Sequence, residues 1–160
     1  MSKVIQTSAL SADKFAPFGD VLELQEQPDQ IINQGNCGRH HDLAKLDFGG
    51  GRAGISLFDA KPRSLPYQLD LLERHPDGSQ AFIPMSLTSF LIIVASDVNG
   101  SPGEPCAFVS APGQAINIHK GVWHGVLTPL HAPGLFAVVD RMGPGPNLEE
   151  YRLAASVEIV

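Results

Sequence analysis

The chain has few cysteines, few charged residues and no long hydrophobic run, and each shortage excludes a class of protein. Its two cysteines, Cys37 and Cys106, are far apart with no partner at metal-binding spacing, so we expect structural thiols in a reducing cytoplasm. No apolar run approaches the roughly 20 residues of a membrane-spanning helix, and the N-terminus lacks the hydrophobic region of a signal peptide. Lys and Arg number 11 against 17 acidic residues and form no basic block, which argues against nucleic-acid and membrane partners.

The abundant residues are those of a globular protein with many short strands. Hydrophobic residues make up 43% of the 160, enough for the core of one domain over residues 1–160. Sixteen Gly and thirteen Pro separate apolar runs, which favours a closed or sandwiched all-β fold. We expect short helices from Ser11 to Phe15 and over residues 148–153. The expected strands cover residues 4–7, 20–23, 53–58, 69–75, 80–85, 87–94, 107–109, 115–118, 122–127 and 135–139.

Residues 69–85 hold the most informative pattern. Residues 76–79 are Pro, Asp, Gly and Ser, which suit a reversal, so the flanking runs predict the two arms of a β-hairpin. In that hairpin His75 and Gln80 would face each other, and Glu73 would share their face because alternate residues of a strand point the same way. Three side chains able to bind metal or carry protons would then line one surface.

A second pattern, His119-x-Gly121-x2-His124, follows a predicted strand. Together with Glu73-x-His75-x4-Gln80, its spacing resembles the two motifs of the cupin family, with several residue types exchanged. That resemblance implies a cupin-like β-barrel, a double-stranded β-helix or jelly roll, with a few short peripheral helices. It also implies a divalent metal held by Glu73, His75, Gln80 and His124, for which Ni²⁺, Zn²⁺, Mn²⁺ and Fe²⁺ are all suitable.

The chain resembles the ureidoglycolate lyase family more closely still. The matching sequence segments are FAPFGDV (15–21), RHHDLA (39–44), LERHPDGSQAFIPM (72–85), VWH (122–124) and DR (140–141), with Asn147. The family usually has Tyr where this chain has His40, and a His where it has Gly125. The resemblance implies release of urea from (S)-ureidoglycolate to give glyoxylate in allantoin breakdown, a homodimer, and nickel as the favoured metal.

The substrate implied by this resemblance carries a carboxylate, which arginine binds well because its planar fork matches the two oxygens. Arg141 and Arg39 are the preferred candidates, with Gln80 as a further substrate ligand. Arg74 ranks lower because it alternates with the site residues and should point away from them. The neighbouring Asp140 leaves open the alternative that Arg141 forms only an internal ion pair.

Elimination also requires a base for the hydroxyl proton and an acid for the departing nitrogen. We assign His119 to the proton transfer toward nitrogen, and Glu73 or His124 to the base where no metal assists. These three residues are the expected catalytic set. His119 also has a structural interpretation, because it replaces a turn proline of the cupin motif and could simply hydrogen-bond a backbone group.

Other functions remain compatible with the sequence. One is another metal-dependent cupin enzyme acting on a small carboxylate, such as an oxygenase or isomerase. A second is a non-catalytic cupin that binds small organic acids, and a third is a hydrolase that releases ammonia from the same substrate. Gly49 to Gly51 is not followed by the Lys-Ser/Thr of a phosphate loop, so neither a nucleotide nor an organic cofactor is expected.

Overall fold

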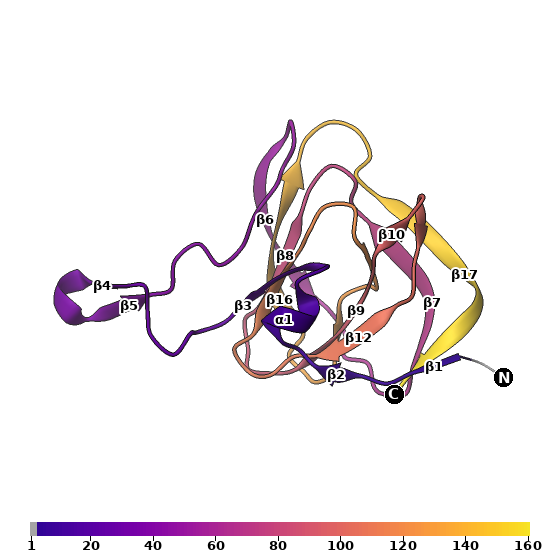
Figure 1. The fold of residues 1–160 in the computed structure, drawn as a ribbon, viewed down its shortest axis with the longest axis horizontal. Helices are drawn as coiled ribbons and strands as arrows, with labels where there is room; N and C mark the ends of the chain where they lie inside the picture. Colours follow the sequence, from indigo (N-terminus) through magenta and orange to yellow (C-terminus); the bar gives the residue numbers. More distant parts are fainter. Residues whose placement is uncertain (1–2) are drawn as a thin grey trace.

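The computed structural model describes residues 3–160, which form two curled β-sheets around a common interior (Figure 1). The larger, eight-stranded sheet runs β1-β17-β7-β14-β9-β12-β2, with β15 paired to β9. Its strands are β1 (Lys3–Ile5), β2 (Ser8–Ala9), β7 (Tyr67–Arg74), β9 (Phe90–Ala95), β12 (Cys106–Val109), β14 (Trp123–His124), β15 (Thr128–Pro129) and β17 (Glu149–Ile159).

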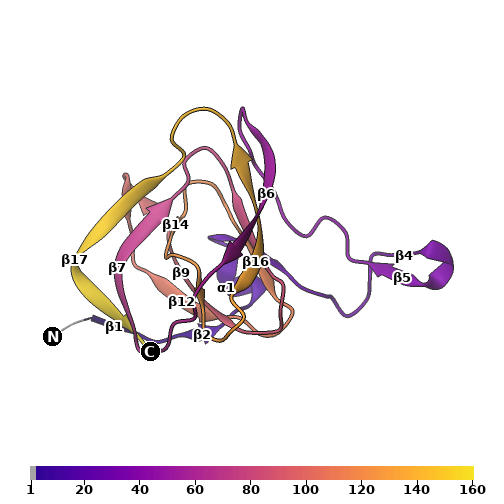
Figure 2. The ribbon, with the colours of Figure 1, turned by 180° about the vertical axis from the view of Figure 1, so that it is seen from behind.

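The second sheet has five strands in the order β3-β13-β8-β16-β6 and faces the first (Figure 2). Its members are β3 (Gly19–Leu22), β6 (Arg52–Asp59), β8 (Gln80–Pro84), β13 (Ala115–Ile118) and β16 (Leu135–Met142). Two small ribbons complete the strands: β4 (Gln30–Ile32) with β5 (Cys37–Arg39), and β10 (Asp97–Val98) with β11 (Ser101–Pro102). The helical turns are α1 (Ala12–Phe15) and η1 (Asn33–Gly35).

The core fills the space between the two sheets, because alternate residues of each strand point inward. Phe82, Phe136 and Val138 of the five-stranded sheet meet Phe90 and Ile92 of the larger sheet. Phe90 and Phe136 make an edge-to-face contact with ring centroids 5.0 Å apart. This almost all-β, curled arrangement confirms the prediction of a cupin-like β fold.

The helix predicted to begin at Ser11 is present. Ser11 caps α1 by accepting a hydrogen bond from the Lys14 backbone N–H at 3.4 Å, and Phe15 is fully buried. Within residues 3–160, none of the helical segments has the length and apolar character needed to cross a membrane.

The helix predicted over residues 148–153 is wrong. That segment belongs to β17, which pairs antiparallel with β7 and, near its end, parallel with β1. Strand pairing overrides the weak local helix preference here, since β17 completes the ladder of β7 and buries Val157 and Ile159.

The predicted hairpin of residues 69–85 is also wrong, although its turn is real. β7 pairs with β14 and β17, whereas β8 pairs with β13 and β16, so the two arms lie in different sheets. Residues 76–79 therefore carry the chain from one sheet to the other. His75 and Gln80 still meet, but across the interior of the fold rather than along one ladder.

Candidate active site

Glu73, His75 and His124 form a cluster in the interior, with one ligand atom of each lying within 4.8 Å of the others. Glu73 on β7 and His124 on β14 are direct cross-strand partners, which places their side chains on one face of the sheet. His75 follows the end of β7, two residues after Glu73, and its ring centroid is 5.2 Å from that of His124. The alternation of side chains along β7 and the pairing of Glu73 with His124 thus bring the three side chains together.

His124 is almost completely buried, with one ring nitrogen bound and the other free. Its Nδ1 lies 3.0 Å from the backbone carbonyl of Gly125, which can only accept, so Nδ1 carries the proton. Nε2 then bears a lone pair and has no hydrogen-bond partner within the described residues. Burial, with a smaller contribution from His75, lowers the pKa of His124 to about 4, so the ring is neutral at pH 7.

His75 and Gln80 approach each other through two acceptor atoms. The His75 Nδ1 donates to the Asn147 carbonyl at 2.7 Å, so its Nε2 bears a lone pair and lies 3.0 Å from Gln80 Oε1. The Gln80 amide cannot simply turn over, since its Nε2 donates to Asp140 Oδ2 at 3.1 Å. A second proton on His75 or a bound cation would satisfy both acceptors.

Glu73 is half-buried beside these rings. Desolvation raises the pKa of its carboxyl, an effect that His75 opposes and Glu150 reinforces. A carboxylate in such surroundings gains stability from a cation and is also a stronger base than one in water.

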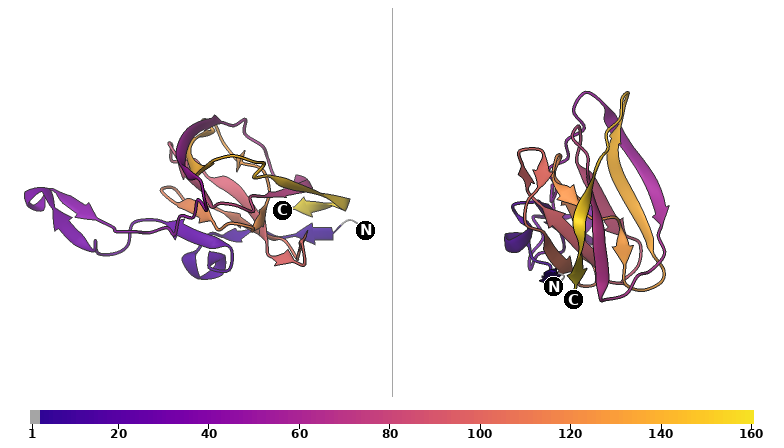
Figure 3. Two further views of the ribbon diagram at one scale, coloured as in Figure 1. Left: turned by 90° about the horizontal axis from the view of Figure 1, so that it is seen from above. Right: turned by 90° about the vertical axis from the view of Figure 1, so that its right-hand side faces the viewer.

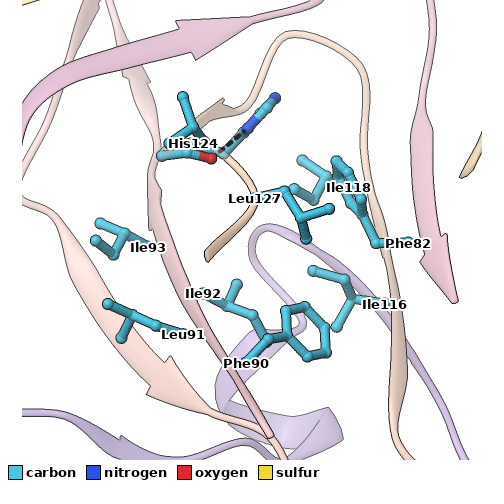
Figure 4. A pocket seen from close by; sticks show the side chains of 11 residues that line it. Phe82, Phe90, Leu91, Ile92, Ile93, Ile116, Ile118, His124 and Leu127 are labelled. Atoms are coloured by element: carbon cyan, nitrogen blue, oxygen red, sulfur yellow. Dashed lines mark hydrogen bonds between the residues drawn. The ribbon is translucent and has the colours of Figure 1, made fainter. Parts of the chain in front are cut away.

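The cluster stands at one end of an otherwise apolar interior. A cavity of about 20 Å³ lies between the sheets, lined by His124 and by apolar side chains such as Phe82, Ile92 and Ile116 (Figure 4). Its volume suits about one water molecule. In Figure 4 the His124 ring lies at one end of this cavity, beyond the apolar side chains, and it keeps an edge-to-face contact with Phe82, with ring centroids 6.4 Å apart.

Arg141 and Asp140 are neighbours on β16 but do not form an ion pair with each other. Asp140 is the cross-strand partner of Gln80 and points inward with it. The Arg141 side chain passes between Gly51 and Gly143, where a Cβ atom would come within about 3 Å of it, and its buried Nε has no partner within residues 3–160. Because Asp140 points inward, strand alternation directs Arg141 to the opposite face of β16, which it shares with Val139, so the structure does not bring Arg141 into the Glu73–His75–His124 cluster.

Three further residues singled out from the sequence lie outside the cluster. His119 hydrogen-bonds with Asp20 at 3.1 Å and lines a separate surface pocket. Arg39 is exposed on the β4–β5 ribbon. Arg74 stacks on Trp123 and pairs with Asp97 and Glu149, so it acts as a structural clamp.

Sequence reasoning missed the supporting roles of Asp140 and Asn147. Asp140 continues the inward alternation of Phe136 and Val138, so an acidic residue in that series was the available signal. Asn147 lies in an irregular segment and positions the site through its carbonyl on His75 and its side-chain oxygen on the Asp77 N–H. No sequence pattern identifies a backbone carbonyl as a site component.

A curled double sheet that encloses a partly buried Glu–His–His cluster defines a cupin-type domain with a candidate metal or acid–base site. Comparison with known sequences is specific: the sequence model of the ureidoglycolate lyase family matches residues 2–160. The chain therefore belongs to the ureidoglycolate lyase family.

Individual relatives agree with this assignment. The chain is 60% identical over 145 residues to a ureidoglycolate lyase of Rhodobacter capsulatus, covering 90% of both chains. It is 50% identical to ureidoglycolate lyase 2 of Rhizobium meliloti, over 89% of this chain and 88% of the relative. It is 47% identical to a ureidoglycolate lyase of a Chelativorans species, over 99% and 97% of the two chains.

Proposed function

We propose that this protein is a ureidoglycolate lyase that eliminates urea from (S)-ureidoglycolate and releases glyoxylate, in the breakdown of allantoin. Family membership supports the substrate. The observation that carries the proposal is the buried, neutral His124, whose free Nε2 lies beside Glu73 and His75. A cytoplasmic location is consistent with two unpaired thiols, Cys37 and Cys106.

A divalent metal fits the donor set that the chain offers. Glu73, His75 and His124 would hold the ion together with Gln80. The Gln80 Oε1 and, in the neutral tautomer, the His75 Nε2 each present a lone pair, and no proton lies between them. Two imidazoles suit Ni²⁺ or Zn²⁺, and the carboxylate and amide oxygens also suit Mn²⁺; Ni²⁺ is favoured by the family resemblance. When bound, the ion would polarise the substrate hydroxyl and favour its alkoxide.

The residues of the chain then divide the remaining tasks. Arg141 would bind the substrate carboxylate, since its guanidinium lacks an acidic partner within residues 3–160. In the elimination the hydroxyl oxygen loses its proton, the C=O bond of glyoxylate forms, the C–N bond breaks and the urea nitrogen gains a proton. Glu73, with its raised pKa, is the carboxylate placed to accept the hydroxyl proton where it is not bound to metal.

Product analysis tests the reaction. Purified protein is incubated with racemic ureidoglycolate, and urea, ammonia and glyoxylate are quantified. Equal amounts of urea and glyoxylate, stopping at half conversion of the racemate, are expected. Ammonia in place of urea would make the protein a hydrolase, and substrate binding without any product would make it a binding protein; either result overturns the proposal.

A further inference from the structure

Glu150 is a carboxylate beside the cluster to which the proposed mechanism assigns no task. It belongs to β17, the long strand that lies beside β7 on one side of the molecule (Figures 2 and 3). Glu150 is the cross-strand partner of Glu73, and Glu73 is in turn the partner of His124 on β14. Because cross-strand partners share a face of a sheet, the three side chains form one row.

The next residue along β17 shows which face this row occupies. Tyr151 packs edge-to-face on Trp123, with ring centroids 5.9 Å apart. Trp123 directly precedes His124 on β14, so the two point to opposite faces of the sheet. Tyr151 therefore lies on the face away from the cluster. By the same alternation Glu150 lies on the face of His124.

The Glu150 carboxylate is exposed and forms no ion pair within residues 3–160. Arg152 follows two residues later on the same face of β17, and it is also absent from the ion pairs of this part of the chain. Like charges directly opposite each other in a sheet are destabilising, since the Cβ atoms are about 5 Å apart, so Glu73 and Glu150 repel each other. The fold thus places a solvent-exposed acceptor at the edge of the cluster.

A ureido group has the chemistry to match such a carboxylate. Its two nitrogens present neighbouring N–H groups that point the same way, and the two oxygens of a carboxylate accept a pair of this kind side by side, as they do from arginine. The group is neutral, so two acidic side chains do not repel it as they repel the carboxylate end of the substrate. Glu150 would attract one end of the substrate and repel the other, which orients the molecule.

Resting on the proposed function, we propose that Glu150 determines specificity for the ureido group of the substrate. Its carboxylate accepts the two ureido N–H groups, and the substrate carboxylate lies away from it. The carbon that bears the hydroxyl is then held beside Glu73 and His124, which share the row with Glu150. Glu150 binds and orients the substrate in this arrangement and transfers no proton.

The binding of two unreactive ligands tests this role without turnover. Ureidoacetate has the ureido group but no hydroxyl, and N-acetylglycine differs from it only by a methyl group in place of the terminal NH2. Each carries one carboxylate, so the ratio of their affinities cancels the effect of charge. Isothermal titration calorimetry uses the full chain loaded with Ni²⁺. Wild type should prefer ureidoacetate by about tenfold or more, whereas Glu150→Gln should bind the two ligands within about threefold of each other.

Glu149→Gln is the matched control, because it makes the same change one residue earlier, where the side chain binds Arg74 at 2.6 Å instead of facing the cluster. It should keep the wild-type preference. A preference that is absent from wild type, or unchanged in Glu150→Gln, overturns the role of Glu150. A tenfold or greater loss of Ni²⁺ affinity in Glu150→Gln would make Glu150 a metal ligand and overturns it equally.

Failure of the proposed function is detected separately, by the urea assay. A wild type that releases no urea but prefers ureidoacetate, with the preference lost in Glu150→Gln, would support ureido recognition by Glu150 and remove only the reaction. A wild type that releases urea without preferring ureidoacetate would keep the reaction and overturn the role of Glu150.

Discussion

His75 and Gln80 meet across the interior through Nε2 and Oε1, 3.0 Å apart, and the hydrogen bonds on their far sides leave both atoms as acceptors. Asn147 fixes the tautomer of His75, and Asp140 fixes the orientation of the Gln80 amide. The fold thus holds two lone pairs at close range, which is unfavourable. A cation bound by both atoms would remove this unfavourable contact.

Asp140 should therefore control metal affinity without contacting the metal. In Asp140→Ala the Gln80 amide can turn its Nε2 toward His75 and satisfy the lone pair directly. We expect Ni²⁺ affinity, measured by isothermal titration calorimetry, to fall by about 10- to 100-fold. Asp59→Ala, on the exposed β6, is the control and should bind as the wild type does. Unchanged affinity in Asp140→Ala would disprove the positioning role.

His124 and His119 should behave differently, because the fold separates them. His124→Ala removes the free Nε2 of the cluster, and we expect metal affinity and kcat each to fall by about 100-fold or more. His119→Ala breaks the hydrogen bond with Asp20 and should leave metal affinity unchanged. Its kcat then reports whether His119 supplies the proton to the urea nitrogen; wild-type kcat would remove it from the catalytic set.

The passage of Arg141 between two glycines offers a test that leaves its charge in place. In Gly143→Ala the new Cβ would lie 2.8 Å from the Arg141 Cζ and Nη2 atoms, so the guanidinium must move. We expect KM for ureidoglycolate to rise by about tenfold, with a small change in metal affinity. Gly50→Ala has open space around its Cβ and should have wild-type kinetics. Equal KM values for the two variants would show that Arg141 does not bind substrate.

Burial of His124 should also make the metal-free protein sensitive to mild acid. The pKa of His124 is lowered from 6.5 to about 4, so between these values the unfolded chain takes up a proton that the folded chain excludes. The free energy of unfolding consequently falls as pH drops, by about 1.4 kcal/mol per pH unit.

Urea unfolding at pH 7 and pH 5 measures this effect. From pH 7 to pH 5 the wild type, stripped of metal by a chelator, should lose about 2 kcal/mol more stability than His124→Gln. The comparison cancels Glu73, whose raised pKa acts in the opposite direction. Identical pH slopes for the two proteins would mean that folding does not lower the pKa of His124, which would contradict its burial as a neutral ring.

The sequence predicts the fold class well because Gly and Pro separate the strands and hydrophobic alternation marks their inner faces. It also places Glu73, His75, Gln80 and His124 together, since motif spacing transfers between cupin-type folds. The start of the central strand is less accurate: β9 begins at Phe90, not at residue 87, because Ser86 and Thr88 bind the Pro133 carbonyl in a loop.

Contacts between distant segments are harder to predict. Residues 76–79 have the composition of a hairpin turn, and local pattern cannot tell whether such a turn joins strands of one sheet or of two. The 148–153 segment is a strand because β7 lies beside it, and no local signal reports that neighbour. His119 shares a motif with His124 but faces the other way, since strand alternation and the bond to Asp20 decide its direction.

The most direct test of the account is turnover of ureidoglycolate before and after rigorous chelation, with the metal content measured in the same samples. Urea and glyoxylate are expected from the metal-loaded protein, are expected to be lost on chelation, and should return with Ni²⁺, Mn²⁺ or Zn²⁺ in the wild type but not in His124→Ala. Full release of urea by metal-free protein would contradict it, and would transfer the chemistry to Glu73 and its neighbouring imidazoles alone.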